Sequence, residues 1–153
     1  MANNGTHLLV TDSGDTIYFI EPGTFRIVRK MQVTNAGKPL PWINELEVID
    51  GDLWANVWPS ECVARINIDT GNVKAWYLLH GLRDMLAQRH GRAHRMDVMN
   101  GIAWDPTGKR LFVTGKWWPA VFEVKPRPFP PGAQPSHERV HALCHPAGGD
   151  PFV

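Results

Sequence analysis

Three segments of the chain share one pattern of strand, turn and strand, and this repetition constrains the fold more than any other feature. They read LLVTDSGDTIYFIEP from Leu8, LWANVWPSECVARINID from Leu53 and LFVTGKWWPAVFEVKP from Leu111. Each combines short apolar runs with turn residues, which is typical of antiparallel strands joined by hairpins. Repeats at intervals of roughly 40–60 residues indicate an architecture in which units of a few strands are stacked side by side.

Turns that contain glycine separate further pairs of apolar runs, because glycine supplies the positive φ that tight hairpins require. The paired runs are residues 7–10 with 16–20, 46–49 with 53–57, and 65–68 with 73–78, while 110–114 follows an Asp-Pro-Thr-Gly turn. Four such strands in each repeat are typical of a β-propeller blade. The sequence therefore predicts an all-β fold, an incomplete propeller of about two to three blades.

An open array of this kind leaves unpaired strand edges, because propellers typically close with at least four blades. We expect an exposed edge near residues 8–10, and possible self-association through such edges. The net charge is +1 and the basic residues form no stripe. Although 43% of the residues are apolar, no apolar run is long enough to span a bilayer. Nucleic acid and membrane are therefore not expected partners.

One helix interrupts the strands. Leu78, Leu82 and Leu86 recur at helical spacing together with Leu79 and Met85, and Gly91 is placed to end the helix. Beyond Lys125 the chain is rich in proline and the apolar periodicity is lost. We predict two regions, a partial propeller over residues 1–125 and a Pro/Gly-rich mobile tail over residues 126–153.

The two cysteines, Cys62 and Cys144, are too few and too far apart to indicate a disulfide framework or a zinc ribbon. We predict free thiols. The start of the chain lacks the character of a signal peptide, so the sequence itself assigns no compartment.

Residues 43–58, INELEVIDGDLWANVW, hold the first group of candidate site residues. Asn44 begins one strand, and Trp54, Asn56 and Trp58 alternate on one face of the next. A buried asparagine needs hydrogen-bond partners, so an alternation of indole and carboxamide is unusual for a plain core face. The alternative interpretation is that the indoles pack between blades and the asparagine caps a turn.

Lys116 ends a later strand beside Trp117 and Trp118. An ammonium group near an apolar cavity can polarise a carbonyl or stabilise an oxyanion, whereas a lysine at a strand end is otherwise solvated. Other polar groups suit turns or oxygen ligation, namely Asp97, Asn100 and Asp105. His137, His141, Cys144 and His145 are ligand types at helical spacing, but they lie in the Pro-rich tail, and we predict no metal site.

Four strings, in order, carry a family resemblance: PWINELEVIDGDLWANVW, CVARINIDTGNVKAWYLLHGLR, MDVMNGIAWDPTGKRLFVTGKWWP and VFEV. Together with SGDTIYFIEPGTF, they extend from about His7 to Val124 and resemble the C-terminal half of the plant-type glutaminyl-peptide cyclotransferases. The resemblance implies a five-bladed propeller with a pocket at its central channel. It also implies an acyltransferase that needs no cofactor and converts the N-terminal glutamine of peptides or proteins to pyroglutamate with release of ammonia.

Matching motif to motif, the resemblance assigns Asn44 and Lys116 as catalytic residues and Trp58, with Asn44, as substrate-binding. The family's acid/base glutamate belongs to the N-terminal half, which this chain lacks, so the activity of the isolated chain stays open. Full-length members of the family are usually in the secretory pathway or the plastid.

Two other functions remain open at this point. The string NGIAWDPTGKRLFVT also resembles a blade of the gluconolactonase-like family, in which Asn100 would bind a divalent cation. The missing half instead suggests a non-catalytic propeller fragment that serves as an interaction module.

Overall fold

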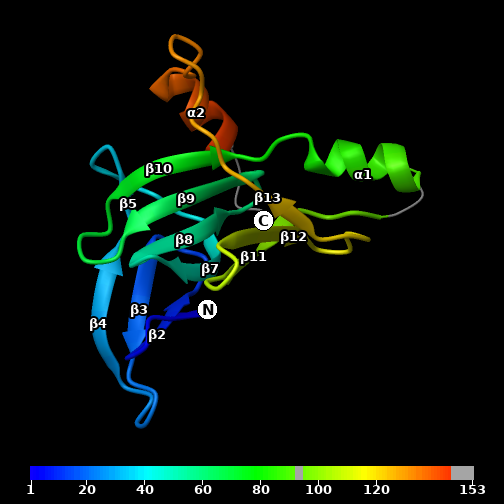
Figure 1. The fold of residues 1–153 in the computed structure, drawn as a ribbon. Helices are drawn as coiled ribbons and strands as arrows, with labels where there is room; N and C mark the ends of the chain where they lie inside the picture. The colour runs from blue at the N-terminus through cyan, green and yellow to red at the C-terminus, as the bar shows by residue number, and fades with distance from the viewer. Residues whose placement is uncertain (92–94, 146–153) are drawn as a thin grey trace.

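The computed structural model describes residues 1–91 and 95–145, and three antiparallel sheets form most of it (Figure 1). The first sheet contains β1 (Ala2–Asn3), β2 (Leu8–Thr11), β3 (Thr16–Ile20) and β4 (Ile27–Gln32). The second contains β7 (Ile43–Ile49), β8 (Asp52–Val57), β9 (Cys62–Asn67) and β10 (Val73–Leu78), and the third contains β11 (Met99–Asp105), β12 (Arg110–Gly115) and β13 (Phe122–Val124). Consecutive strands are neighbours in every sheet, so each sheet is a meander.

The repeat seen in the sequence corresponds to equivalent strands in the three sheets. Its members are β2 with β3, β8 with β9, and β12 with β13, which are the second and third strands of their sheets. A short hairpin of β5 (Thr34–Asn35) and β6 (Lys38–Pro39) links the first two sheets. The prediction of an all-β fold built from repeated antiparallel sheets is confirmed.

The second sheet has a core on each of its faces. Leu53, Ala55 and Val57 of β8 pack in one apolar cluster with Leu9 and Ile17 of the first sheet. Trp54 belongs to a second cluster, which includes Met99 and Leu111 of the third sheet. All six residues of β8 are buried. Leu53 and Trp54 belong to different clusters, so the expected alternation along this strand is confirmed, with Trp54 in the core.

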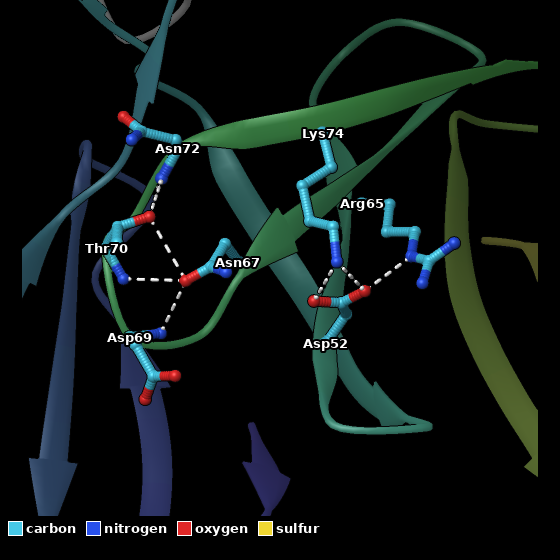
Figure 2. Close-up of polar contacts among 7 residues, drawn as sticks. All are labelled: Asp52, Arg65, Asn67, Asp69, Thr70, Asn72 and Lys74. Carbon is cyan, nitrogen blue, oxygen red and sulfur yellow. Dashed lines mark hydrogen bonds and ion pairs between the residues drawn. The ribbon is translucent and has the colours of Figure 1, made fainter.

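A charged cluster of residues from β8, β9 and β10 lies at the end of the second sheet where β8 begins (Figure 2). The Asp52 carboxylate is 5% exposed and accepts hydrogen bonds from Arg65 Nε at 2.6 Å and from Lys74 Nζ at 2.8 and 3.0 Å. Burial opposes its ionisation, but the hydrogen bonds from Lys74 and Arg65 outweigh burial and lower the pKa of Asp52. Beside it, Asn67 Oδ1 accepts from the backbone of Asp69 and Thr70 and so shapes the turn before β10.

The helix α1 (Leu82–His90) begins later than the sequence predicts. Leu78 belongs to β10 and pairs with Cys62, and Leu79 N donates to Glu61 O, so these two leucines continue the sheet. Within the helix only Leu86 is buried, while Met85 is 57% exposed. The prediction of an apolar helical face that begins at Leu78 is therefore wrong, because Leu78 and Leu79 pair with the neighbouring strand instead of joining the helix. Gly91 caps the C-terminus as expected.

A second helix, α2 (His137–Cys144), lies in the region where the sequence reading expected no regular element. Ser136 caps its N-terminus by accepting a hydrogen bond from Arg139 N at 3.2 Å. A disulfide joins Cys144, at the end of α2, to Cys62, at the start of β9, across a sequence separation of 82. The prediction of free thiols is wrong, because the fold brings these distant cysteines within bonding range.

The strand edges also differ from expectation. Residues 8–10 are not an edge, because β2 pairs with β1 on one side and with β3 on the other. The edges of the first sheet are β1 and β4, and Ile27 and Val28 on β4 are about half exposed. In the described part of the chain, neither helix is long and apolar enough to cross a membrane.

Candidate functional site

A bulge at the start of β7 places Asn44. Ile43 pairs with Val57 and Leu46 with Ala55, so the register shifts between them and Asn44 and Glu45 occupy the irregular stretch. Bulges redirect side chains from the regular alternation of a strand. Asn44 is half-buried, and no hydrogen bond joins its side chain to another described residue.

Trp58 follows β8 directly and therefore lies at the same end of the second sheet as Asn44. Its backbone N–H donates to Trp42 O at 2.9 Å, and the two indole rings lie with centroids 5.6 Å apart at an interplanar angle of 49°. Trp42 has a φ of 67°, a conformation that bulky side chains rarely adopt. Strained backbone of this kind is concentrated at functional sites.

Lys116 follows β12, in the third sheet, and its surroundings repeat those of Trp58. Its N–H donates to Val98 O at 3.0 Å, just as Trp58 N–H donates to Trp42 O. The next residue, Trp117, has a φ of 62° and an 80% exposed side chain. Lys116 is exposed and forms no ion pair within the described residues, so its ammonium group is available to a ligand.

The bulge of β7 recurs in β11. Met99 pairs with Gly115 and Ile102 with Val113, with the register shift between them. Asn100 therefore corresponds to Asn44, and Lys116 corresponds to Trp58. Because β7 contacts β11, the three sequence-predicted residues Asn44, Trp58 and Lys116 lie at the same end of two adjacent sheets.

Side chains of the second sheet bind the backbone of β11 directly. Asn56 Oδ1 accepts from Gly101 N at 3.0 Å, Glu45 Oε2 from Ile102 N at 2.8 Å and Glu47 Oε1 from Trp104 N at 3.0 Å. Asn56 is fully buried, and its Oδ1 finds a partner in Gly101 N–H, whereas its Nδ2 has none among the described residues. Its carboxamide joins the two sheets.

Glu45 is the residue that sequence reasoning passed over. Burial raises the pKa of its carboxyl to about 7, against the opposing effect of the hydrogen bond from Ile102 N–H. One signal in the sequence could have identified Glu45. It is a carboxylate next to the candidate asparagine, on a strand otherwise rich in buried apolar residues. Its importance depends on the partner strand, more than 50 residues away in sequence, as the separation of 57 between Glu45 and Ile102 shows.

The other polar candidates divide between the two ends of β11. Asp97 and Asn100 lie beside Lys116 and the bulge, whereas Asp105 ends the strand at the opposite end. Asp105 Oδ1 accepts from Thr107 N and Gly108 N, and Asp105 Oδ2 pairs with Arg110, so this residue shapes its turn as predicted. Asn100 Oδ1 is buried and has no hydrogen-bond partner among the described residues.

The histidine cluster lies on α2, next to a cavity of about 380 Å³ between that helix and the β5–β6 hairpin. His141 and His145 stack with centroids 4.3 Å apart, and Cys144 is held in the disulfide. Within residues 1–91 and 95–145, no three His, Cys, Asp or Glu side chains are grouped to hold a metal ion. This cavity does not include Asn44, Trp58 or Lys116.

Comparisons with known proteins identify the family of the chain. The family model for glutamine cyclotransferase matches residues 1–126. A glutaminyl-peptide cyclotransferase of Arabidopsis thaliana is 41% identical over 126 residues, which cover 82% of this chain and 38% of that protein. The crystal structure of Myxococcus xanthus glutaminyl cyclase superposes with a TM-score of 0.73 at 36% identity, covering 80% of this chain and 52% of that one.

The chain thus spans well under two thirds of each relative, while most of its own length is matched. The matched residues include every strand of the three sheets, and they end before α2 and its disulfide. This chain belongs to the glutamine cyclotransferase family.

Proposed function

We propose that the chain supplies half of a glutaminyl-peptide cyclotransferase pocket, in which Asn44, Trp58 and Lys116 bind and activate a peptide with an N-terminal glutamine. The observation that carries the proposal is their common location. The three residues come from β7, from the residue after β8 and from the residue after β12, at one end of adjacent sheets. The family resemblance further implies a closed propeller of five blades, to which this chain would contribute its three sheets.

The reaction needs these groups for distinct reasons. The α-amine of the substrate attacks its own side-chain carboxamide carbon, so a C–N bond forms and the carbonyl oxygen becomes an oxyanion. The attacking amine then loses a proton and the side-chain amide nitrogen gains one. The carbonyl re-forms as the original C–N bond breaks, and the protonated nitrogen leaves as ammonia. Because attack is intramolecular, holding the glutamine side chain folded supplies much of the rate.

Each side chain fits one of these needs. The Trp58 indole, supported by the ring of Trp42, provides an apolar wall against which the folded side chain is held. The half-buried Asn44 offers both a donor and an acceptor to the carboxamide or the amine. The exposed Lys116 ammonium group would stabilise the oxyanion or assist the leaving group. The family's acid/base glutamate would come from outside this chain, and its contribution is typically about 10²–10⁴-fold in rate.

A fusion of the chain to the N-terminal half of a family cyclase tests the proposal. We expect the fusion to release ammonia from a Gln-initiated peptide in a coupled assay, with a Glu-initiated peptide as the poor-substrate control. Lys116→Ala should lower kcat, Trp58→Ala should affect both KM and kcat, and Asn44→Ala should fall between them.

Lys109→Ala serves as the matched control, because Lys109 lies in the turn at the opposite end of β12. It should keep the kinetics of the fusion. If the fusion folds and Lys116→Ala retains the parental kcat, the lysine is structural and the site assignment fails. If the folded fusion releases no ammonia, the chain is better described as a non-catalytic interaction module.

A further inference from the structure

β11 is the edge strand of the third sheet, so backbone N–H groups on its outer side, such as those of Ile102 and Trp104, find no acceptor in their own sheet. Between the paired residues Met99 and Ile102 the ladder to β12 is interrupted, and residues inside a bulge lose their regular partners. Gly101 is required there, since a Cβ on it would lie 2.7 Å from Thr114 Cγ2. Buried N–H groups without acceptors cost about 1–3 kcal/mol each, so these donors need acceptors from elsewhere.

The second sheet supplies those acceptors from residues next to the candidate site. Ile102 N–H donates to Glu45 Oε2 at 2.8 Å, and Gly101 N–H donates to Asn56 Oδ1 at 3.0 Å. Glu45 is the neighbour of Asn44, and Asn56 precedes Trp58 by two positions. The two hydrogen bonds therefore connect the part of the chain that carries Asn44 and Trp58 to the bulge of β11.

The same bulge supports Lys116. Met99 pairs with Gly115, and Val98 O accepts from Lys116 N–H at 3.0 Å. Asp97 N–H in turn donates to Lys116 O at 2.9 Å. A displacement of Ile102 and Gly101 relative to β7 would thus shift Lys116 relative to Asn44.

We propose that Glu45 is a positioning residue that sets the placement of Lys116 relative to Asn44 and Trp58 through its hydrogen bond to Ile102 N–H. The role concerns the proposed cyclotransferase site and rests on that function. Glu47 makes a similar bond to Trp104 N–H at 3.0 Å, but two residues farther from the bulge. It provides a matched control on the same strand.

The ionisation of Glu45 gives the role a measurable signature. Burial raises the pKa of its carboxyl to about 7. The charged groups that act on it are the Met1 ammonium group, which lowers its pKa, and the Glu47 carboxylate, which raises it. A charged acceptor binds an N–H more strongly than a neutral one. The bond to Ile102, and the position of Lys116 with it, should therefore respond to pH near neutrality.

Backbone NMR of the whole 153-residue chain tests the proposal, using Glu45→Leu, Glu45→Gln and Glu47→Leu. In Glu45→Leu we expect the Ile102 amide to exchange about tenfold faster or more, because a hydrogen bond to a charged group is lost. The Lys116 amide resonance should shift in the same variant. Glu45→Gln keeps an acceptor oxygen and should restore both signals, whereas Glu47→Leu should alter Trp104 and leave Lys116 unchanged.

The pH titration provides a second readout that does not depend on the leucine variant being folded. The Ile102 and Lys116 amides of the parent should titrate together with a midpoint near the Glu45 pKa, and neither should titrate in Glu45→Gln. An Ile102 amide that responds while Lys116 does not would overturn the positioning role and leave only a contact between sheets. If both amides respond but the fusion described above releases no ammonia, the cyclotransferase proposal fails while the coupling stands.

Discussion

The Cys62–Cys144 disulfide should contribute a large share of the stability of this chain. It closes a loop with a sequence separation of 82. In the chain-entropy account, a loop of this length restricts the unfolded state by about 4–5 kcal/mol at 25 °C. For a chain of 153 residues, that loss corresponds to a fall in Tm of roughly 10–15 °C. Both cysteines are fully buried, so loss of packing would add to the effect.

Reduction of the parent removes the cross-link but keeps both buried sulfur atoms, whereas Cys144→Ala removes the cross-link together with the sulfur at the end of α2. Thermal melting followed by circular dichroism, with and without a thiol-free reductant, provides the measurement. We expect reduction of the parent to lower Tm to nearly that of Cys144→Ala, and the reductant to leave the variant unchanged. A parent whose Tm is insensitive to complete reduction would refute the reasoning.

Three further predictions concern charges and edges. Asp52→Asn should lower the free energy of unfolding by about 1–3 kcal/mol in urea, because it weakens the interactions of a buried side chain with two partly exposed cations. The stabilisation by Asp52 should be present above the unfolded pKa and be lost as pH falls through the lowered folded pKa. The raised pKa of Glu45 has the opposite sign, so its contribution should be present below pH 4.5 and decrease by about 2 kcal/mol as pH rises through 7, a dependence that urea titrations should not find in Glu45→Gln. Open edges such as β4, with Ile27 and Val28 exposed, should promote self-association, and Val28→Lys should shift the chain toward monomer in size-exclusion chromatography.

Local signals predicted the strands well because hairpin chemistry is local. The turn Asp50-Gly51 joins β7 to β8, and the repeat that begins at Leu8, Leu53 and Leu111 marks equivalent strands. The alternation along β8 also predicted which side chains share a face, since Leu53 and Trp54 enter different cores. These features need only the period of a strand and the preferences of turn residues.

Non-local contacts were beyond the sequence pattern. The spacing of Leu78 and Leu79 fits a helix, and only their pairing with β9 and Glu61 shows that they extend a sheet. Cys62 and Cys144 gave no sign of bonding until the fold brought α2 against the second sheet. Likewise, Asn44, Trp58 and Lys116 were assigned by family motif, whereas the role of Glu45 depends on a strand that lies far along the chain.

The central claim is that a Gln-initiated peptide binds at the end of the second and third sheets that carries Asn44, Trp58 and Lys116. Titration of the isotope-labelled chain with such a peptide, monitored by NMR, tests it most directly, with assignments checked in Trp58→Phe and with a Glu-initiated peptide in parallel. The account predicts saturable shifts of the Trp58 indole N–H and the Lys116 amide with the glutamine peptide, and much weaker shifts with the glutamate peptide. Equal responses to both peptides, or shifts confined to the cavity between α2 and the β5–β6 hairpin, would contradict it.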